Sequence, residues 1–246
     1  MRPMIAGNWK MHGLSAQLQA IEAVGASVDR SNPRCDVLIC TPATLIDRAA
    51  SMAAGRISIG GEDCSSEVEG AFTGDVSGAM LKDAGASAVI VGHSERRSQY
   101  GETSAITAAK AQAAVRAGLL AIICIGETGS QRTAHRTFRV CDDQINVSVP
   151  PDIDAAMIAV AHEPIWAIGS GHTPSLQEIL DVHSHIREAV VCHLGDAGRT
   201  VRLLYGGSVD PENAEPILAL ANVDGALVGG ASLTAPSFLS IIGANI

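Results

Sequence analysis

Lys10, His93 and Glu163 place an amine, an imidazole and a carboxylate directly after three short apolar runs of this 246-residue chain. Such a set suits acid–base chemistry on a small anion, because a lysine and a few backbone N–H groups are enough to hold one phosphate. Each residue alone has a plainer interpretation: a solvated lysine, a satisfied core histidine, or a glutamate that ends a strand. Their shared placement favours one common site.

The elements that must position these groups are eight short apolar runs, which alternate with segments of helical periodicity. This alternation predicts an α/β fold with a parallel sheet, either a closed (β/α)8 barrel or a doubly wound sheet, and the periodicity leaves both open. In a barrel, residues that follow the strands converge on one mouth, where active sites are built. The runs are residues 3–9, 36–40, 56–60, 87–92, 119–125, 156–162, 200–206 and 224–229.

Three helix starts carry recognisable signals. Ser15 is expected to cap the helix that contains Leu18, and Pro174-Ser175 to open a helix with Leu176 on its inward face. Asp210-Pro211 is expected to start another helix, with the aspartate as cap and the proline at the first helical position.

Composition and charge narrow the class of protein. The net charge is −9 with no dense basic patch, which argues against an extended nucleic-acid surface. Six scattered cysteines show neither zinc-site spacing nor a disulfide framework. The sequence shows no signal peptide and no apolar stretch of membrane-spanning length, so we expect a reducing cytoplasm and no membrane partner.

Longer strings around the candidate residues resemble triosephosphate isomerases, in the order and at the spacing of that family, from residue 3 to about residue 243. The resemblance implies one (β/α)8 TIM-barrel domain over residues 1–246. It also implies an isomerase of glycolysis and gluconeogenesis that needs no cofactor and no metal. The strings are AGNWKM (6–11), VGHSERR (91–97), CIGET (124–128), EPIWAIG (163–169) and YGGSV (205–209).

The resemblance implies a role for each catalytic candidate. Glu163 would take a proton from one carbon of the substrate and return it to the neighbouring carbon. His93 would polarise the carbonyl and move protons between the two oxygens, working best as a neutral imidazole at the start of a helix. Lys10 would hold the phosphate and stabilise the developing negative charge, and Asn8 and Glu95 would orient this group.

The same resemblance implies a phosphate site and a lid. Gly169, Ser208, Gly229 and Gly230 would offer backbone N–H groups to the phosphate oxygens. Residues 164–174 would form a lid over the ligand, which excludes water from the enediolate.

The family is usually dimeric, and the resemblance implies that the loop from Glu62 to Ser77 reaches the neighbouring subunit. Phe72 on so long a loop suits an interface anchor. We expect Thr73 to approach the partner's Lys10 region and Asp75 to pair with the partner's Arg96.

Four positions depart from the family's common pattern. His12 stands where asparagine is common, Glu62 where glutamine is common, and His162 where tyrosine commonly precedes the base. The segment His172-Thr173-Pro174 replaces Lys-Thr-Ala at the end of the lid. None of these changes touches the candidate catalytic residues, so we expect activity to be retained.

Three other functions compete with this interpretation. An isomerase of the same fold could act on a larger ketose phosphate such as a tetrulose phosphate, although the unaltered strings at 6–11 and 205–209 favour a triose. A barrel that had lost catalysis would show damage at Lys10, His93 or Glu163. A nucleotide-binding enzyme would need G-x-G-x-x-G after the first strand, and this chain lacks it there.

Overall fold

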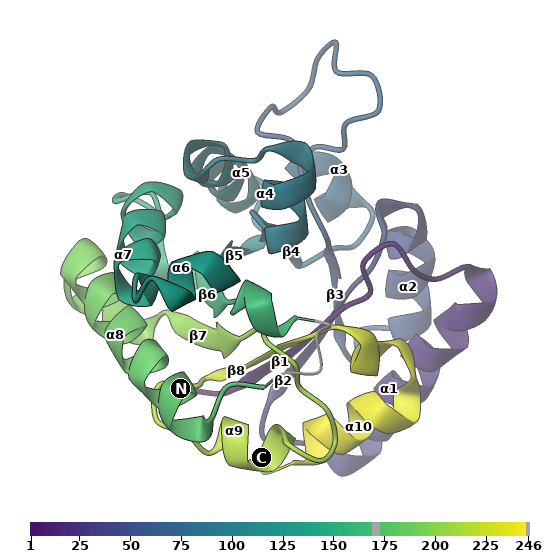
Figure 1. Cartoon of the computed structure of the whole chain (residues 1–246). Helices are drawn as coiled ribbons and strands as arrows, with labels where there is room; N and C mark the ends of the chain where they lie inside the picture. Colours follow the sequence, from purple (N-terminus) through teal and green to yellow (C-terminus); the bar gives the residue numbers. More distant parts are fainter. Residues whose placement is uncertain (169–172, 245–246) are drawn as a thin grey trace.

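The eight apolar runs form the eight strands of a closed parallel barrel in the computed structural model, which describes residues 1–168 and 173–244 (Figure 1). Each strand pairs with its sequence neighbours, and β8 closes the sheet by pairing with β1. The barrel is therefore confirmed and the doubly wound sheet is excluded. The strands are β1 (Met4–Asn8), β2 (Asp36–Cys40), β3 (Ser58–Gly61), β4 (Ala88–Val91), β5 (Leu120–Ile125), β6 (Ile158–His162), β7 (Arg202–Tyr205) and β8 (Gly225–Val228).

Alternation along the strands divides the core into two layers. In β2, Leu38 and Cys40 belong to the cluster that fills the barrel, while Val37 and Ile39 pack in the larger cluster between barrel and helices. Successive strand residues face opposite sides of a sheet, and both sides of this sheet are covered, so both sets must be apolar. Among the described residues the inner cluster holds no aromatic side chain, which fits its narrow interior.

Helices surround the barrel, as Figure 1 shows. Among the described residues, none of them is both long and apolar enough to cross a membrane. They are α1 (Leu18–Ser31), α2 (Ile46–Ala53), α3 (Gly78–Asp83), α4 (Ser94–Tyr100), α5 (Ser104–Arg116), α6 (Gly129–Thr133), α7 (Thr137–Ser148), α8 (Leu176–Leu194), α9 (Ala214–Leu218) and α10 (Ala235–Gly243).

Two predicted helix starts are wrong in detail. Ser15 lies in a 3-10 turn, η1 (Ser15–Gln17), ahead of α1, and its hydroxyl accepts from Arg48 and caps nothing. Asp210 accepts from the backbone N–H groups of Glu212 and Asn213, so it caps a turn and α9 begins only at Ala214.

The start of α8 agrees with the prediction, with one exception. Ser175 is its N-cap, and Ser175 and Glu178 satisfy each other's backbone N–H groups as a capping box. Leu176 was expected to face inward but is 43% exposed at the first residue of α8.

The segment between β3 and α3 is a long loop, residues 62–77, that projects from the body of the molecule at the top of Figure 1. Val68 and Phe72 are exposed on it. The interface anchor expected at Phe72 stays a prediction.

Candidate active site

Seven of the nine predicted site residues line one cavity of about 320 Å³ at the C-terminal ends of the strands. Glu95 joins them through an ion pair with Lys10. The remaining candidate, Gly169, and residues 170–172 of the predicted lid lie outside the described residues. The seven are Asn8, Lys10, His93, Glu163, Ser208, Gly229 and Gly230.

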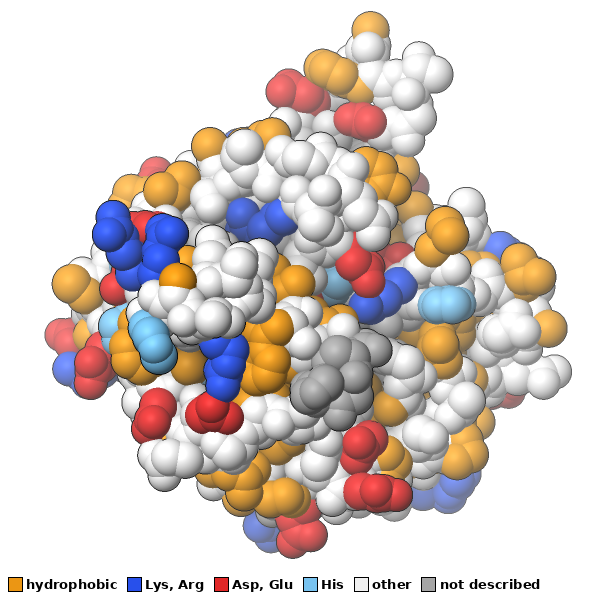
Figure 2. All heavy atoms as spheres, viewed as in Figure 1, with side chains coloured by type: hydrophobic (Ala, Val, Ile, Leu, Met, Phe, Trp, Pro, Cys, Tyr) orange, Lys and Arg blue, Asp and Glu red, His pale blue; other side chains and the backbone are white. Residues whose placement is uncertain are grey.

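The mouth of the barrel faces the viewer in Figure 2. Basic and acidic side chains are interspersed on this face, and no continuous basic surface appears on it. That distribution suits one small anion in a cavity and gives a nucleic-acid backbone little to bind.

Lys10 enters the cavity from the end of β1 in an unusual backbone conformation. Its φ of 57° is left-handed, and its backbone N–H donates to Oδ1 of Asn8 over 3.1 Å. Its ammonium lies 2.7 Å from Oε1 of Glu95. A left-handed lysine costs free energy of about 1–3 kcal/mol, and such strain concentrates at functional sites. The fold thus holds the ammonium at a fixed place on the rim.

His93 and Glu163 meet across the cavity, from the ends of β4 and β6. Oε1 of Glu163 lies 2.8 Å from Nε2 of His93, and Oε2 accepts from the backbone N–H of Ser94 over 2.9 Å. On the other side of the ring, the backbone N–H of Glu95 donates to Nδ1 of His93 over 3.2 Å, as the N-cap bond of α4. Because Nδ1 accepts, the proton of the neutral ring lies on Nε2, which faces the cavity.

These contacts shift the pKa values of both Glu163 and His93. Burial alone would raise the pKa of Glu163, but His93, the N–H of Ser94 and the charge of Lys10 together lower it. Burial, the largest single effect, lowers the pKa of His93, but the charge and hydrogen bond of Glu163 together with the charge of Glu95 raise it above its ordinary value. We expected the N-terminus of a helix to lower the pKa of His93. That expectation is wrong, because the Glu163 carboxylate points at the ring and favours its protonated form.

Two glycines allow the backbone around Glu163 to pack closely. A Cβ on Gly126 would lie 1.8 Å from the carbonyl oxygen of Glu163, and a Cβ on Gly206 would lie 3.0 Å from its Cγ. Any side chain at either position would push the carboxylate out of place. The glycines in the strings at 124–128 and 205–209 therefore fix the position of Glu163.

Another wall of the cavity is built from the ends of β7 and β8. The hydroxyl of Ser208 donates to the carbonyl of Ala167 over 2.9 Å, which ties this wall to the segment after Glu163. Gly229 precedes the short 3-10 helix η6 (Gly230–Leu233) and Gly230 is its first residue, and a Cβ on Gly230 would meet nothing within 4 Å. Backbone at a helix start that borders open space suits an anion.

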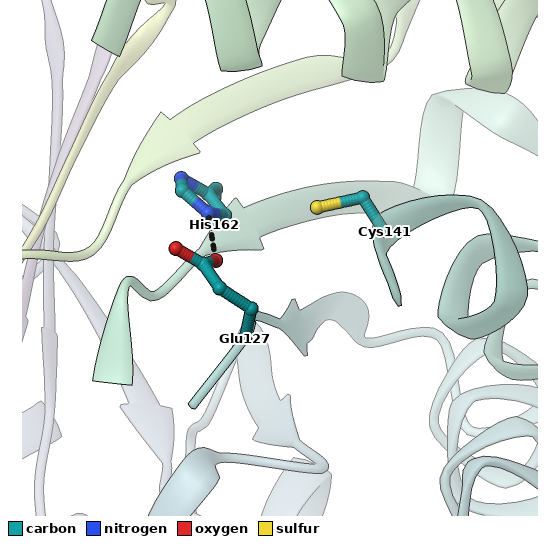
Figure 3. Close-up of side chains that lie close together, drawn as sticks. All are labelled: Glu127, Cys141 and His162. Carbon is teal, nitrogen blue, oxygen red and sulfur yellow. Dashed lines mark hydrogen bonds and ion pairs between the residues drawn. The ribbon is translucent and has the colours of Figure 1, made fainter. Parts of the chain in front are cut away.

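Sequence analysis missed a buried polar cluster of Glu127, Cys141 and His162, the residue before Glu163 (Figure 3). Oε1 of Glu127 accepts from the indole N–H of Trp166 over 2.8 Å, and Oε2 lies 3.1 Å from Nε2 of His162. The thiol of Cys141 points toward these groups from α7. Glu127 stands inside the string at 124–128, but nothing in its spacing linked it to Cys141.

Comparisons with known proteins agree with this geometry. The family model described as triosephosphate isomerase matches residues 3–245. Triosephosphate isomerases of Afipia carboxidovorans and Ruegeria pomeroyi are each 54% identical to the chain, over 98% and 99% of it and 96% and 97% of their own lengths. The crystal structure of triosephosphate isomerase from Bartonella henselae superposes with a TM-score of 0.93 at 45% identity, with 99% of both chains covered.

Proposed function

The chain belongs to the triosephosphate isomerase family, and we propose that Glu163, His93 and Lys10 carry the proton transfers of its reaction. The reaction interconverts glyceraldehyde 3-phosphate and dihydroxyacetone phosphate through an enediolate. The chemical problem is to remove a proton from carbon beside a carbonyl and to stabilise the charge that results.

Glu163 is the base. Its carboxylate is buried, is held ionised by its neighbours, and sits at the end of β6 in the cavity wall. When substrate takes the place of His93 as its neighbour, the carboxylate loses a stabilising contact inside a dry site, which makes it a stronger base. It takes the proton from one carbon and returns it to the adjacent carbon.

His93 and Lys10 stabilise the oxygen that becomes negative. The Nε2–H of neutral His93 faces the cavity and donates to the carbonyl oxygen, and the Lys10 ammonium supplies positive charge beside it. Asn8 and Glu95 hold Lys10 through its backbone N–H and its ammonium. Donors that are fixed in advance need no reorganisation during the reaction.

The substrate phosphate is proposed to lie against the wall formed by Ser208, Gly229 and Gly230. Backbone N–H groups at the start of η6 and the charge of Lys10 suit an anion there. Gly169 completes this set in the sequence-based prediction and remains a proposal.

One observation carries the assignment: side chains from the ends of β1, β4 and β6 line the same cavity of about 320 Å³. A coupled assay of glyceraldehyde 3-phosphate conversion tests it, with Glu163→Asp beside the wild type. Displacement of the carboxylate by about 1 Å should lower kcat roughly 100-fold with little change in the folded state measured by circular dichroism. Wild-type kcat in a folded Glu163→Asp protein would remove Glu163 from the mechanism.

We also propose a homodimer through the loop of residues 62–77. Phe72 is 49% exposed on this loop and would bury its ring against a second copy of the chain. Thr73 would approach the partner's Lys10 region. Arg96 already pairs within its own chain with Asp63 over 2.9 Å and with Glu102. Its expected pair with the partner's Asp75 would therefore extend an existing ionic network.

A cytoplasmic location is proposed as well. The six cysteines are free thiols, and five of them are buried, which suits a compartment that keeps thiols reduced.

A further inference from the structure

We propose that Glu127, Cys141 and His162 form a binding site for a borderline divalent transition-metal ion, for which Zn²⁺ is the natural probe. One oxygen, one sulfur and one nitrogen donor come from three elements: the segment after β5, helix α7 and the end of β6. All three residues are buried, and Figure 3 shows the thiol and the carboxylate directed toward the imidazole. Carboxylate, thiolate and imidazole are the donor types that zinc takes in proteins.

The distances are close to those a metal needs. The three donor atoms lie within 4.8 Å of one another, and the Glu127–His162 pair is already at 3.1 Å. Zinc bonds of about 2.0–2.3 Å place donors roughly 3.3–3.8 Å apart in a tetrahedron, so the thiol has to approach by about 1 Å. A change of that size is within reach of a side-chain torsion of Cys141.

Charge and protons balance on binding. Zn²⁺ replaces the thiol proton of Cys141, which leaves the chain as H⁺, and the resulting thiolate and the Glu127 carboxylate together neutralise the ion. A neutral site suits a buried position, where a lone charge is costly. His162 binds through Nε2 as a neutral imidazole, with its proton on Nδ1. A water molecule fills the fourth position.

The surroundings provide the outer contacts that such ligands require. The Trp166 indole N–H already orients the Glu127 carboxylate through Oε1, which leaves Oε2 for the metal. Nδ1 of His162 has no hydrogen-bond partner among the described residues, nor has Nε2 of His183, and the two rings meet edge to face with centroids 5.8 Å apart.

Nε2 of His183 can accept a hydrogen bond from Nδ1 of His162 once the metal occupies Nε2 of that ring. Its Nδ1 lies 2.9 Å from the carbonyl oxygen of Asn222, so Nδ1 carries the proton and Nε2 offers a lone pair. Metal-bound histidines almost always donate their other N–H in this way.

The site is a property of this chain and does not depend on the proposed catalytic roles. His162 stands where the family commonly carries tyrosine, which cannot supply the nitrogen donor. The position also adjoins Glu163, and Glu127 receives the backbone N–H of Ile165 at its carbonyl over 3.1 Å. A metal bound here therefore restrains the segment from His162 to Ile165, which contains Glu163.

Cobalt substitution tests the proposal directly, because a Co²⁺–thiolate bond gives a near-ultraviolet charge-transfer band. The whole protein is dialysed against a chelator and titrated with Co²⁺, with Cys141→Ser and His162→Tyr beside it. Cys192→Ser is the matched control, because Cys192 is the exposed thiol of the chain. Isomerase activity before metal addition shows that each variant is folded.

We expect the band in the wild type and in Cys192→Ser, saturating at one Co²⁺ per chain and disappearing when Zn²⁺ is added. It should be absent from Cys141→Ser and His162→Tyr. A wild type without the band, or a band that survives in Cys141→Ser and is lost in Cys192→Ser, overturns the proposal.

Discussion

The carboxylate of Glu163 rests 2.8 Å from Nε2 of His93, so the proposed base and the proposed electrophile are each other's partners before substrate arrives. The N–H of Ser94 fixes the second carboxylate oxygen over 2.9 Å. This pairing keeps Glu163 ionised and lowers its pKa despite complete burial of the side chain. Substrate binding must replace the contact with His93, which turns a stabilised carboxylate into a reactive one.

Loss of the positive charge at Lys10 should lower activity severely. In Lys10→Met, kcat/KM should fall about 10²–10³-fold or more, because one fixed electrostatic donor beside the oxyanion is worth that much. The coupled isomerase assay measures it. Lys82→Met, a surface lysine of α3 that donates to the carbonyl of Gly118, is the control and should keep wild-type kinetics. Equal activity of the two variants would contradict the role of Lys10.

Glu62 should make stability depend on pH. Burial, the largest effect, and Glu95 raise the pKa of Glu62 to about 8 from an ordinary value of 4.5, against smaller opposing effects of Lys10. The folded chain therefore retains this proton where the unfolded chain loses it, so stability falls as pH rises from about 4.5 to about 8 and stays reduced above that.

Glu62→Gln should remove the fall in folding stability that Glu62 causes as pH rises. Its Tm should exceed that of the wild type by several degrees at pH 8.5, since ~1 kcal/mol moves the Tm of a protein this size by roughly 2–4 °C. The difference should shrink toward pH 5. Glu67→Gln, on the exposed part of the same loop, should show no such pH-dependent gain. A gain for Glu62→Gln that is the same at both pH values would point to a cause other than ionisation.

A charge at Phe72 should break the proposed dimer. Phe72→Asp should run as a monomer in analytical ultracentrifugation at concentrations where the wild type is dimeric, because burial of a carboxylate at an interface is costly. Phe138→Asp is a matched control, since Phe138 is also an exposed phenylalanine, 46% against 49%, but lies on α7. Dissociation by Phe138→Asp alone would place the interface on α7.

The strands could be predicted, and so could the shared location of the candidate catalytic residues, because both depend on local sequence. A buried parallel strand needs a run of apolar residues, and Lys10, His93 and Glu163 each follow such a run. Helix starts were less predictable: Ser15 carries the right side chain for a cap, yet Arg48, 33 residues away, takes its hydroxyl.

Contacts between residues far apart in the chain could not be predicted, because local sequence does not determine them. The raised pKa of His93 depends on which way Glu163 points, 70 residues later in the chain, and composition does not set that direction. The meeting of Glu127 with Cys141 and His162 depends on how α7 packs on the barrel, and spacing along the chain does not reveal it.

Solvent deuterium exchange tests the proton-transfer account most directly. Product formed from dihydroxyacetone phosphate in D₂O is examined by NMR for deuterium at the carbon beside the carbonyl, with wild type and Glu163→Gln compared. We expect deuterium at that carbon with the wild type, because the proton held by Glu163 can exchange with solvent, and a loss of both exchange and turnover by orders of magnitude with Glu163→Gln. Undiminished exchange and turnover in a folded Glu163→Gln protein would contradict the role of Glu163 as base.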